Sequence, residues 1–293
     1  MNLPVNVTLG LDKLVETVAN ATGLTALGTI MNAYGEAKAQ TYLAKQKAQT
    51  EAEIEILKMQ GQEKVAQYIL ARNNQKVENV SEIVSKAQQQ FEIGEKVSSE
   101  PVDNDWMTRF LGIAEDVSDN EMQELWARVL AGEVKHPHSY SLRTLEVLRN
   151  ISKEEAELIA KVSAFVFEMN YLCNEDFALN LQDKITLDDI GMVCGEDLIH
   201  SKTVTVEKLS FVLNHCQIMN IYAPVGTKFE IRCVRLTKAG SEIVRLVQGI
   251  DYQKYLQSIS AKIKQQGASK VTINQIFKWE GIQYHYLLQE IEV

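Results

Sequence analysis

The sequence contains few residues that interrupt helices or cross-link the chain. Its 293 residues include only four prolines, at positions 4, 101, 137 and 224, which leaves long stretches free to form helix. The four cysteines, at positions 173, 194, 216 and 233, include no Cys-x-x-Cys pair, and no export signal precedes them. We therefore expect a reduced, cytoplasmic protein in which helix predominates.

Basic residues are scarce relative to acidic ones. The chain has 30 Lys and Arg against 39 Asp and Glu, a formal net charge of −9. This balance argues against a protein that coats nucleic acid or an anionic membrane through bulk charge. Nucleic acid is therefore a disfavoured partner, although a local basic patch remains an open alternative.

The chain has no long apolar run, but residues 17–35 carry no charge. As a helix this segment would span about 28 Å, close to the thickness of a bilayer core. Nine of its nineteen residues are Thr, Asn or Gly, which makes it too polar to insert alone. Small residues that let helices approach closely recur every four positions, at Ala21, Thr25, Thr29 and Ala33. We expect a buried or oligomerising helix here, with conditional contact at the inner membrane as the alternative.

Residues 36–60 are rich in Ala, Lys, Glu and Gln, the strong helix formers. They predict one long helix that continues through Gly61, because no proline interrupts residues 18–75. The following segment 94–105 combines Gly, Ser, Pro and Asp without periodicity, as linkers do. We therefore assign residues 1–96 to a helical arm that oligomerises or lies near a membrane.

Residues 105–182 predict a central domain of helices joined by short loops. A capping box at Ser118 and Glu121 predicts a helix with Trp126 in the core and a stop at Gly132. A second capping box, Ser152 to Glu155, predicts another helix.

Residues 183–250 predict a winged-helix-like domain. The expected elements are helices over 187–193 and 206–216, a two-stranded hairpin over 218–236 and a closing helix over 236–247. Residues 251–293 form a C-terminal packing segment, with a helix start at Thr272. The predicted fold class is thus mainly α: a long N-terminal helical arm, a central helical domain and a C-terminal winged-helix-like α+β part.

The block from Glu124 to Leu158 resembles the signature of a bacterial family known as domain of unknown function 2806, and it is also similar to abortive-infection alpha proteins. The matching positions are Trp126, Ala127, Leu130, Ala131, Gly132, Glu133, Ser139, Ser141, Arg143 and Thr144. The family usually has glycine where this chain has His138, and a larger residue argues against a tight turn with positive φ. The resemblance implies a role in bacterial immunity.

Glu133 and Lys135, with Asp116 and Asp119 upstream, match the acidic-x-Lys pattern of metal-dependent nucleases. That chemistry needs its carboxylates on adjacent strands, whereas Glu133 follows a capped helix, so a chance match is favoured. The neighbouring histidines lack the spacing of a zinc site on a helix. We therefore predict no catalytic residues, no metal and no cofactor.

Arg143 is the best candidate for binding an anionic ligand. Together with Ser139 and Ser141 it could hold a phosphate or carboxylate at a helix start. Alternatively, Arg143 pairs with Glu133 or Glu124 and stabilises the turn. We favour the structural role, because a capping loop needs the same residue types.

Lys228, Arg232 and Arg235 are the candidate DNA contacts of the winged-helix-like domain. The helix expected to enter a major groove, near 204–216, offers only Lys208 and His215, so protein binding is favoured over DNA binding.

The leading hypothesis is a non-enzymatic bacterial defence protein of the abortive-infection type, or a stress protein. It would act through assembly, as a homo-oligomer that meets an unidentified protein partner, for which a phage-derived protein is one candidate. The alternatives are a winged-helix DNA-binding regulator and a metal-dependent nuclease.

Overall fold

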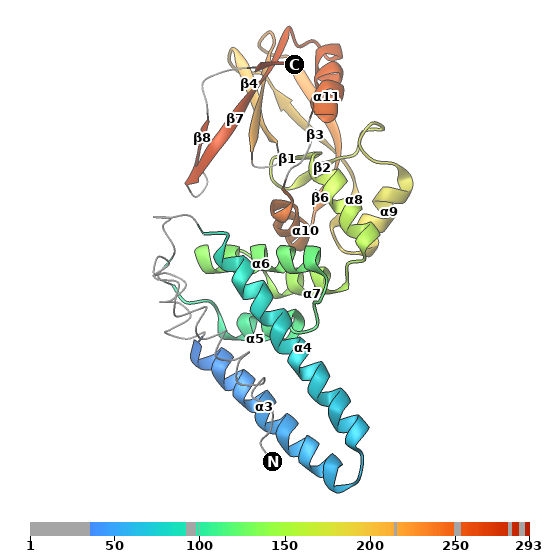
Figure 1. Cartoon of the computed structure of the whole chain (residues 1–293). Helices are drawn as coiled ribbons and strands as arrows, with labels where there is room; N and C mark the ends of the chain where they lie inside the picture. The colour runs from blue at the N-terminus through green and yellow to red at the C-terminus, as the bar shows by residue number, and fades with distance from the viewer. Residues whose placement is uncertain are drawn as a thin grey trace. The chain divides into compact units, whose positions relative to one another are not determined.

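The computed structural model describes residues 36–91, 98, 100–213, 216–248, 253–280, 283–286 and 291–293. Contacts divide the chain into two compact units, Met1–Leu145 and Glu146–Val293 (Figure 1). The uncharged segment 17–35, with the predicted oligomer or membrane residues Ala21, Thr25, Thr29 and Ala33, lies outside the described residues.

A helical hairpin begins the described part of the first unit. Helix α3 (Glu36–Met59) and helix α4 (Glu63–Gln88) lie side by side and pack on each other (Figure 1). The predicted single helix through Gly61 is therefore wrong. Gly61 has a φ of +72°, a backbone conformation that glycine adopts without the steric cost of a Cβ atom, and the chain reverses there.

Three further helices lie beyond the hairpin: α5 (Asn104–Ala114), α6 (Asn120–Lys135) and α7 (Leu142–Asn150), the last of which crosses into the second unit. Their core is aromatic. The Phe110 ring stacks on Trp106 at 5.2 Å and meets the edge of Trp126 at 5.6 Å. Trp126 is fully buried, as the apolar spacing of its helix predicted.

The start and the end of α6 both differ from the prediction. The N-cap is Asp119, whose carboxylate accepts a hydrogen bond from the Met122 N–H at 2.9 Å, and it is not Ser118. The helix also passes Gly132 and ends at Lys135. Gly132 therefore does not end the helix, and the close packing described below explains the glycine at this position.

The second unit begins with helices and continues as a sheet. Its elements are α8 (Lys153–Ser163), β1 (Val166–Phe167), β2 (Tyr171–Cys173), α9 (Leu181–Asp189), β3 (Val193–Thr203), β4 (Lys208–Leu213), β5 (Gln217–Tyr222), β6 (Lys228–Leu236), α10 (Lys238–Ile243), η2 (Val244–Leu246), α11 (Gln253–Gln265), β7 (Lys270–Glu280), β8 (Gln283–Tyr286) and β9 (Ile291–Glu292). The capping box of α8 is confirmed: Ser152 and Glu155 each accept a hydrogen bond from the other's main chain.

The sheet is antiparallel, with the strand order β3-β6-β2-β1-β4-β5-β7-β8, and β9 pairs with β7. The prediction of a mainly α fold with a small winged-helix part is therefore wrong, because the chain has a mixed α and β fold. Residues 208–213 form a strand where a helix was expected over 206–216, and of the helix expected over 187–193 only residues 187–189 are helical, at the end of α9. Thr272 lies in β7 and starts no helix. Phe211 and Leu213 are buried and alternate with the half-buried Ser210 and Val212, a period typical of a strand.

The predicted hairpin over 218–236 is correct in its two strands and wrong in their pairing. Strand β5 pairs with β4 and β7, whereas β6 pairs with β2 and β3. The two strands are therefore separated in the sheet, although only five residues join them in the chain.

The sheet curls strongly at the end of β3. The His200 ring on this strand lies 4.8 Å from the Tyr171 ring and 5.9 Å from the Phe211 ring, on β2 and β4. Neither strand is a neighbour of β3, so only a curved sheet can bring these rings together. Burial lowers the pKa of His200, helped by the charge of Lys202, and its Nε2 atom is buried without a hydrogen-bond partner among the described residues.

Candidate functional site

The turn between α6 and α7 is built around the buried carboxylate of Glu133. One carboxylate oxygen accepts a hydrogen bond from the His138 N–H at 2.7 Å, and the other accepts one from the Tyr140 N–H at 2.9 Å. The side chain is only 1% exposed. Glu133, considered above as a nuclease ligand, instead satisfies two main-chain donors that would otherwise lack partners near the buried end of a helix.

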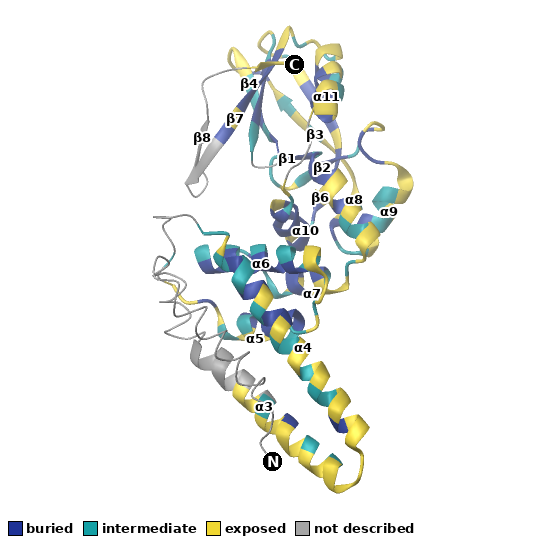
Figure 2. Ribbon diagram, in the orientation of Figure 1, coloured by how far each residue is buried: buried dark blue, intermediate teal, exposed yellow. Residues whose placement is uncertain are grey.

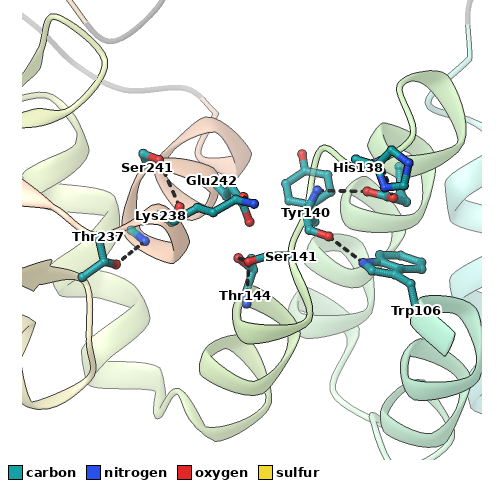
Figure 3. Close-up of polar contacts among 11 residues, drawn as sticks. Trp106, His138, Tyr140, Ser141, Thr144, Thr237, Lys238, Ser241 and Glu242 are labelled. Carbon is teal, nitrogen blue, oxygen red and sulfur yellow. Dashed lines mark hydrogen bonds and ion pairs between the residues drawn. The ribbon is translucent and has the colours of Figure 1, made fainter. Parts of the chain in front are cut away.

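A side chain of α5 also bonds to the turn. The indole N–H of Trp106 donates to the Tyr140 carbonyl at 2.7 Å (Figure 3). The ring of Tyr140 lies against α6, where a Cβ atom on Gly132 would come within 2.7 Å of its Cε2 atom. Glycine at position 132 therefore permits the close approach of Tyr140 to the helix.

His138 adopts a φ of 68° within this turn. We expected no positive φ at position 138, because histidine has a Cβ atom, and this expectation is wrong. The two hydrogen bonds accepted by Glu133 hold the loop in shape, and they outweigh the cost of a left-handed conformation in a residue with a Cβ atom.

The serines and Thr144 shape the start of α7. The Ser139 hydroxyl donates to the His136 carbonyl at 2.6 Å. The hydroxyls of Ser141 and Thr144 lie 3.0 Å apart (Figure 3). Arg143 is exposed, and no described residue forms an ion pair with it, so the predicted pairing with Glu133 or Glu124 is not observed.

Arg128 is a residue of this block that the sequence analysis missed. Burial lowers the pKa of Arg128, and the opposing influences come from Glu124 and Tyr140. Its Nε atom is buried without a hydrogen-bond partner among the described residues. The sequence signal that could have identified Arg128 is its position directly after Trp126 and Ala127, two residues of the family motif.

Residues 63–177 match the model of a family described as protein of unknown function (DUF2806). The predicted resemblance to that family is therefore confirmed for this part of the chain, and the matched region includes the whole Glu133 turn. No curated protein and no solved structure matches the chain. The resemblance to abortive-infection alpha proteins is not among these findings and stays a prediction.

The three basic residues proposed as DNA contacts lie in the second unit, outside the region that matches DUF2806, and two of them already have acidic neighbours. Lys228 pairs with Glu230. Arg232 bonds to Glu175 at 3.1 Å and to Asp176 at 2.9 Å, and these hydrogen bonds raise the pKa of Arg232. Only Arg235 is exposed without an ion pair to a described residue. The residues expected to form the groove-reading helix are strand β4 instead.

Two thiols face each other in the sheet of the second unit. Cys173 on β2 lies opposite Cys233 on β6, and both side chains are fully buried. Burial raises the pKa of Cys173 to about 12 and that of Cys233 to about 11. Because the thiolate is the reactive form, neither side chain is poised as a nucleophile. Within the described ranges, no three His, Cys, Asp or Glu side chains gather in a way that could hold a metal ion.

Exposed large apolar side chains are concentrated in the stretch that runs from just before α9 into β3, where the sequence predicted no site. Eight large apolar side chains are exposed among the described residues of the second unit, and five of them fall between positions 177 and 199: Phe177, Leu181, Ile185, Leu198 and Ile199. An ion pair between Lys184 and Asp197 links the helix to the strand, and Figure 2 shows exposed residues along α9. We call these five residues the α9–β3 surface.

In the described part of the chain, no helix combines the length and the apolar character needed to cross a membrane.

Proposed function

We propose that the chain acts in the cytoplasm as a non-enzymatic component of bacterial antiviral defence or stress response, through protein–protein assembly. The observation that carries the proposal is the α9–β3 surface. Apolar area in water is unfavourable by about 25 cal/mol per Å², so clustered exposed apolar residues mark interaction surfaces. The defence role is inferred from the resemblance of the family block to abortive-infection alpha proteins.

The contacts of the motif residues support an architectural role for the family block. Trp126 fills the core, Glu133 closes the turn, and Ser141 with Thr144 shapes the start of α7. Since these side chains already have structural partners, we infer that the block stabilises the fold and does not form a reactive site.

The experiment compares wild-type chain with a Leu181→Lys and Ile185→Lys double variant in bacteria challenged with a panel of phages. Both positions are exposed on α9, so the charges should not affect folding. We expect the wild type to lower the efficiency of plating of at least one phage tenfold or more, and the double variant to lose that protection. Val225→Lys is the matched control, because Val225 is 70% exposed but lies outside the α9–β3 surface.

Mass photometry of the same purified proteins checks the assembly itself. The wild type should form species larger than the monomer, alone or with a phage-encoded protein, and the double variant should form fewer. Equal protection and equal assembly by wild type and double variant would contradict the proposal. Leakage from anionic vesicles tests the conditional membrane contact, which is the alternative to a buried or oligomerising helix for residues 17–35.

A further inference from the structure

Cys173 and Cys233 lie directly opposite each other on two neighbouring strands. Cys173 is on β2 and Cys233 is on β6, and the register of the two strands makes them partners. Opposite residues of an antiparallel pair project from the same face of the sheet. The two thiols therefore lie side by side, and both side chains are fully buried.

The main-chain hydrogen bonds next to this pair show how close the two cysteines are. The Asn174 N–H donates to the Arg232 carbonyl at 2.8 Å, so these two residues form a hydrogen-bonded pair. Cys173 and Cys233 precede and follow them, and therefore form a non-hydrogen-bonded pair, whose Cα atoms lie about 4.5 Å apart. A disulfide spans Cα separations of about 4.4–6.8 Å. The two sulfur atoms can thus be joined without a change of register.

The other two cysteines do not have this geometry. Cys194 is exposed and lies opposite Arg235 on β6, and Cys216 directly precedes β5. Neither lies opposite a cysteine. The register therefore distinguishes the Cys173–Cys233 pair from every other pairing of native thiols.

Helix α11 lies over Cys173. The Tyr255 hydroxyl of this helix is buried beside the Cys173 thiol. Two turns further along the helix, Lys262 pairs with the buried Glu175 at 3.1 Å, which holds α11 against the end of β2. Burial also raises the pKa of both thiols, so they stay protonated and react slowly while the helix is in place.

We propose that Cys173 and Cys233 form a reversible disulfide when the folded chain meets a small peroxide. One thiol attacks the peroxide and becomes a sulfenic acid, with release of water. The second thiol then displaces the sulfenic oxygen as a second water. In total two S–H bonds and the O–O bond break, one S–S bond and two O–H bonds form, and the peroxide takes up both electrons. This inference is independent of the proposed function, because it needs no partner and no assembly.

The disulfide would connect β2 to β6 and close the loop of residues 173–233, which contains α9 and β3 to β5. A cross-link across a loop of this length removes conformational freedom from the unfolded chain and so stabilises the folded one. A Cα separation of about 4.5 Å is at the short end of the range for disulfides, which makes the bond easier to reduce. A dithiol reductant should therefore restore both thiols.

The experiment uses the full chain with Cys194→Ser and Cys216→Ser, so that only the Cys173–Cys233 pair can react. The reduced, folded protein is treated with hydrogen peroxide, then with catalase, and is unfolded and alkylated with iodoacetamide. We expect most chains to be two hydrogen atoms lighter, to take up no alkyl group and to remain monomeric on a non-reducing gel. Dithiothreitol added before the alkylation should restore both sites.

Removing one thiol is the first control. Cys233→Ala in the same background should form no disulfide within the chain, so that peroxide leaves Cys173 alkylated or oxidised alone. Cys173→Ala makes the same test from the other side if Cys233→Ala does not give a folded circular dichroism spectrum.

Lys262→Ala tests the role of α11. Loss of the ion pair to Glu175 should loosen the helix and speed disulfide formation several-fold. Lys254→Ala is the matched control, because Lys254 is exposed on the same helix and should leave the rate unchanged. Urea unfolding followed by circular dichroism should place the midpoint of the oxidised chain about 1 M or more above that of the reduced chain.

Three results would overturn the inference. In the first, both cysteines of the peroxide-treated chain still take up alkyl groups. In the second, the two cysteines carry separate sulfinic acids and no S–S bond. In the third, the disulfide forms only on refolding from urea with a glutathione mixture, which would show that the folded pair cannot react. Equal rates for Lys262→Ala and Lys254→Ala would reject the cover by α11. None of these results bears on phage protection, so the proposed function stands or fails by its own test.

Discussion

Replacing Glu133 with alanine should destabilise the first unit severely. The carboxylate is buried and accepts the main-chain N–H groups of His138 and Tyr140 at 2.7 and 2.9 Å. Alanine supplies no acceptor, and the site is too buried for water to replace the carboxylate freely. Two donors would then be left without partners at the point where the chain turns from α6 into α7.

The expected loss follows from the two hydrogen bonds. Each hydrogen bond to a charged group contributes about 1.5–3 kcal/mol, so their loss costs about 3–6 kcal/mol. A typical domain is stable by about 5–15 kcal/mol, so the change removes a large fraction of the stability of the unit. Glu133→Gln keeps one acceptor oxygen and should fall between the wild type and Glu133→Ala.

Urea unfolding followed by tryptophan fluorescence measures this loss. Trp106 and Trp126 both belong to the first unit, and Trp106 bonds directly to the turn. A Trp279→Phe background removes the one tryptophan of the second unit, so that the signal reports the first unit alone.

The control is Glu100→Ala, which removes an exposed carboxylate 3.3 Å from His138 Nε2. An exposed pair of this kind contributes less than about 1 kcal/mol. If Glu133→Ala loses no more stability than this control, the carboxylate does not hold the turn and our account of the family block is refuted.

Three further predictions concern single residues. Gly132→Ala should destabilise the first unit by about 1–3 kcal/mol, because the added methyl group would press on the Tyr140 ring. The control is Gly112→Ala, whose added methyl group meets nothing within 4 Å and which should stabilise its helix by about 0.5–1 kcal/mol. His138→Gly should stabilise the unit by about 0.5–1 kcal/mol in urea unfolding, because glycine relieves the positive φ. The lowered pKa of His200 favours the neutral ring in the folded state, so the second unit should lose stability as the pH falls below about 6.5. His200→Gln should reduce this change of stability with pH.

The outcomes that contradict these predictions are specific. Equal unfolding midpoints for the two glycine variants would show that Tyr140 yields to the added methyl group. A less stable His138→Gly would show that the imidazole contributes more than the strained backbone costs. Equal changes in midpoint between pH 7.5 and 5.5 for wild type and His200→Gln would assign the pH dependence to other groups.

Features that depend on neighbouring residues were predictable from the sequence. The capping box of α8 needs only Ser152 and Glu155, three positions apart, and it forms as expected. The apolar spacing around Trp126 placed that side chain in the core, where it lies. The start of α6 differed by one residue, because Ser118 and Asp119 are both good caps and the helix uses only one.

The sheet was not predictable in the same way. Short apolar runs such as 208–213 fit a strand or a buried helix, and the strand that completes the pairing lies far along the chain. Asn220, for example, donates to Asn274, which is 54 positions away. The turn of the family block was unpredictable for the same reason, because the hydrogen bond from Trp106 to Tyr140 joins residues 34 positions apart.

By itself, the sequence determined the capping box of α8, the burial of Trp126 and the resemblance of residues 63–177 to their family, because each depends on residue types at short spacing. Only the tertiary structure decided that Glu133 closes a turn, that His138 takes a positive φ, and that β3 is an edge with Ile199 exposed. The physical reason is that exposure and strand pairing are properties of what the rest of the chain covers, and no short stretch of sequence contains that information.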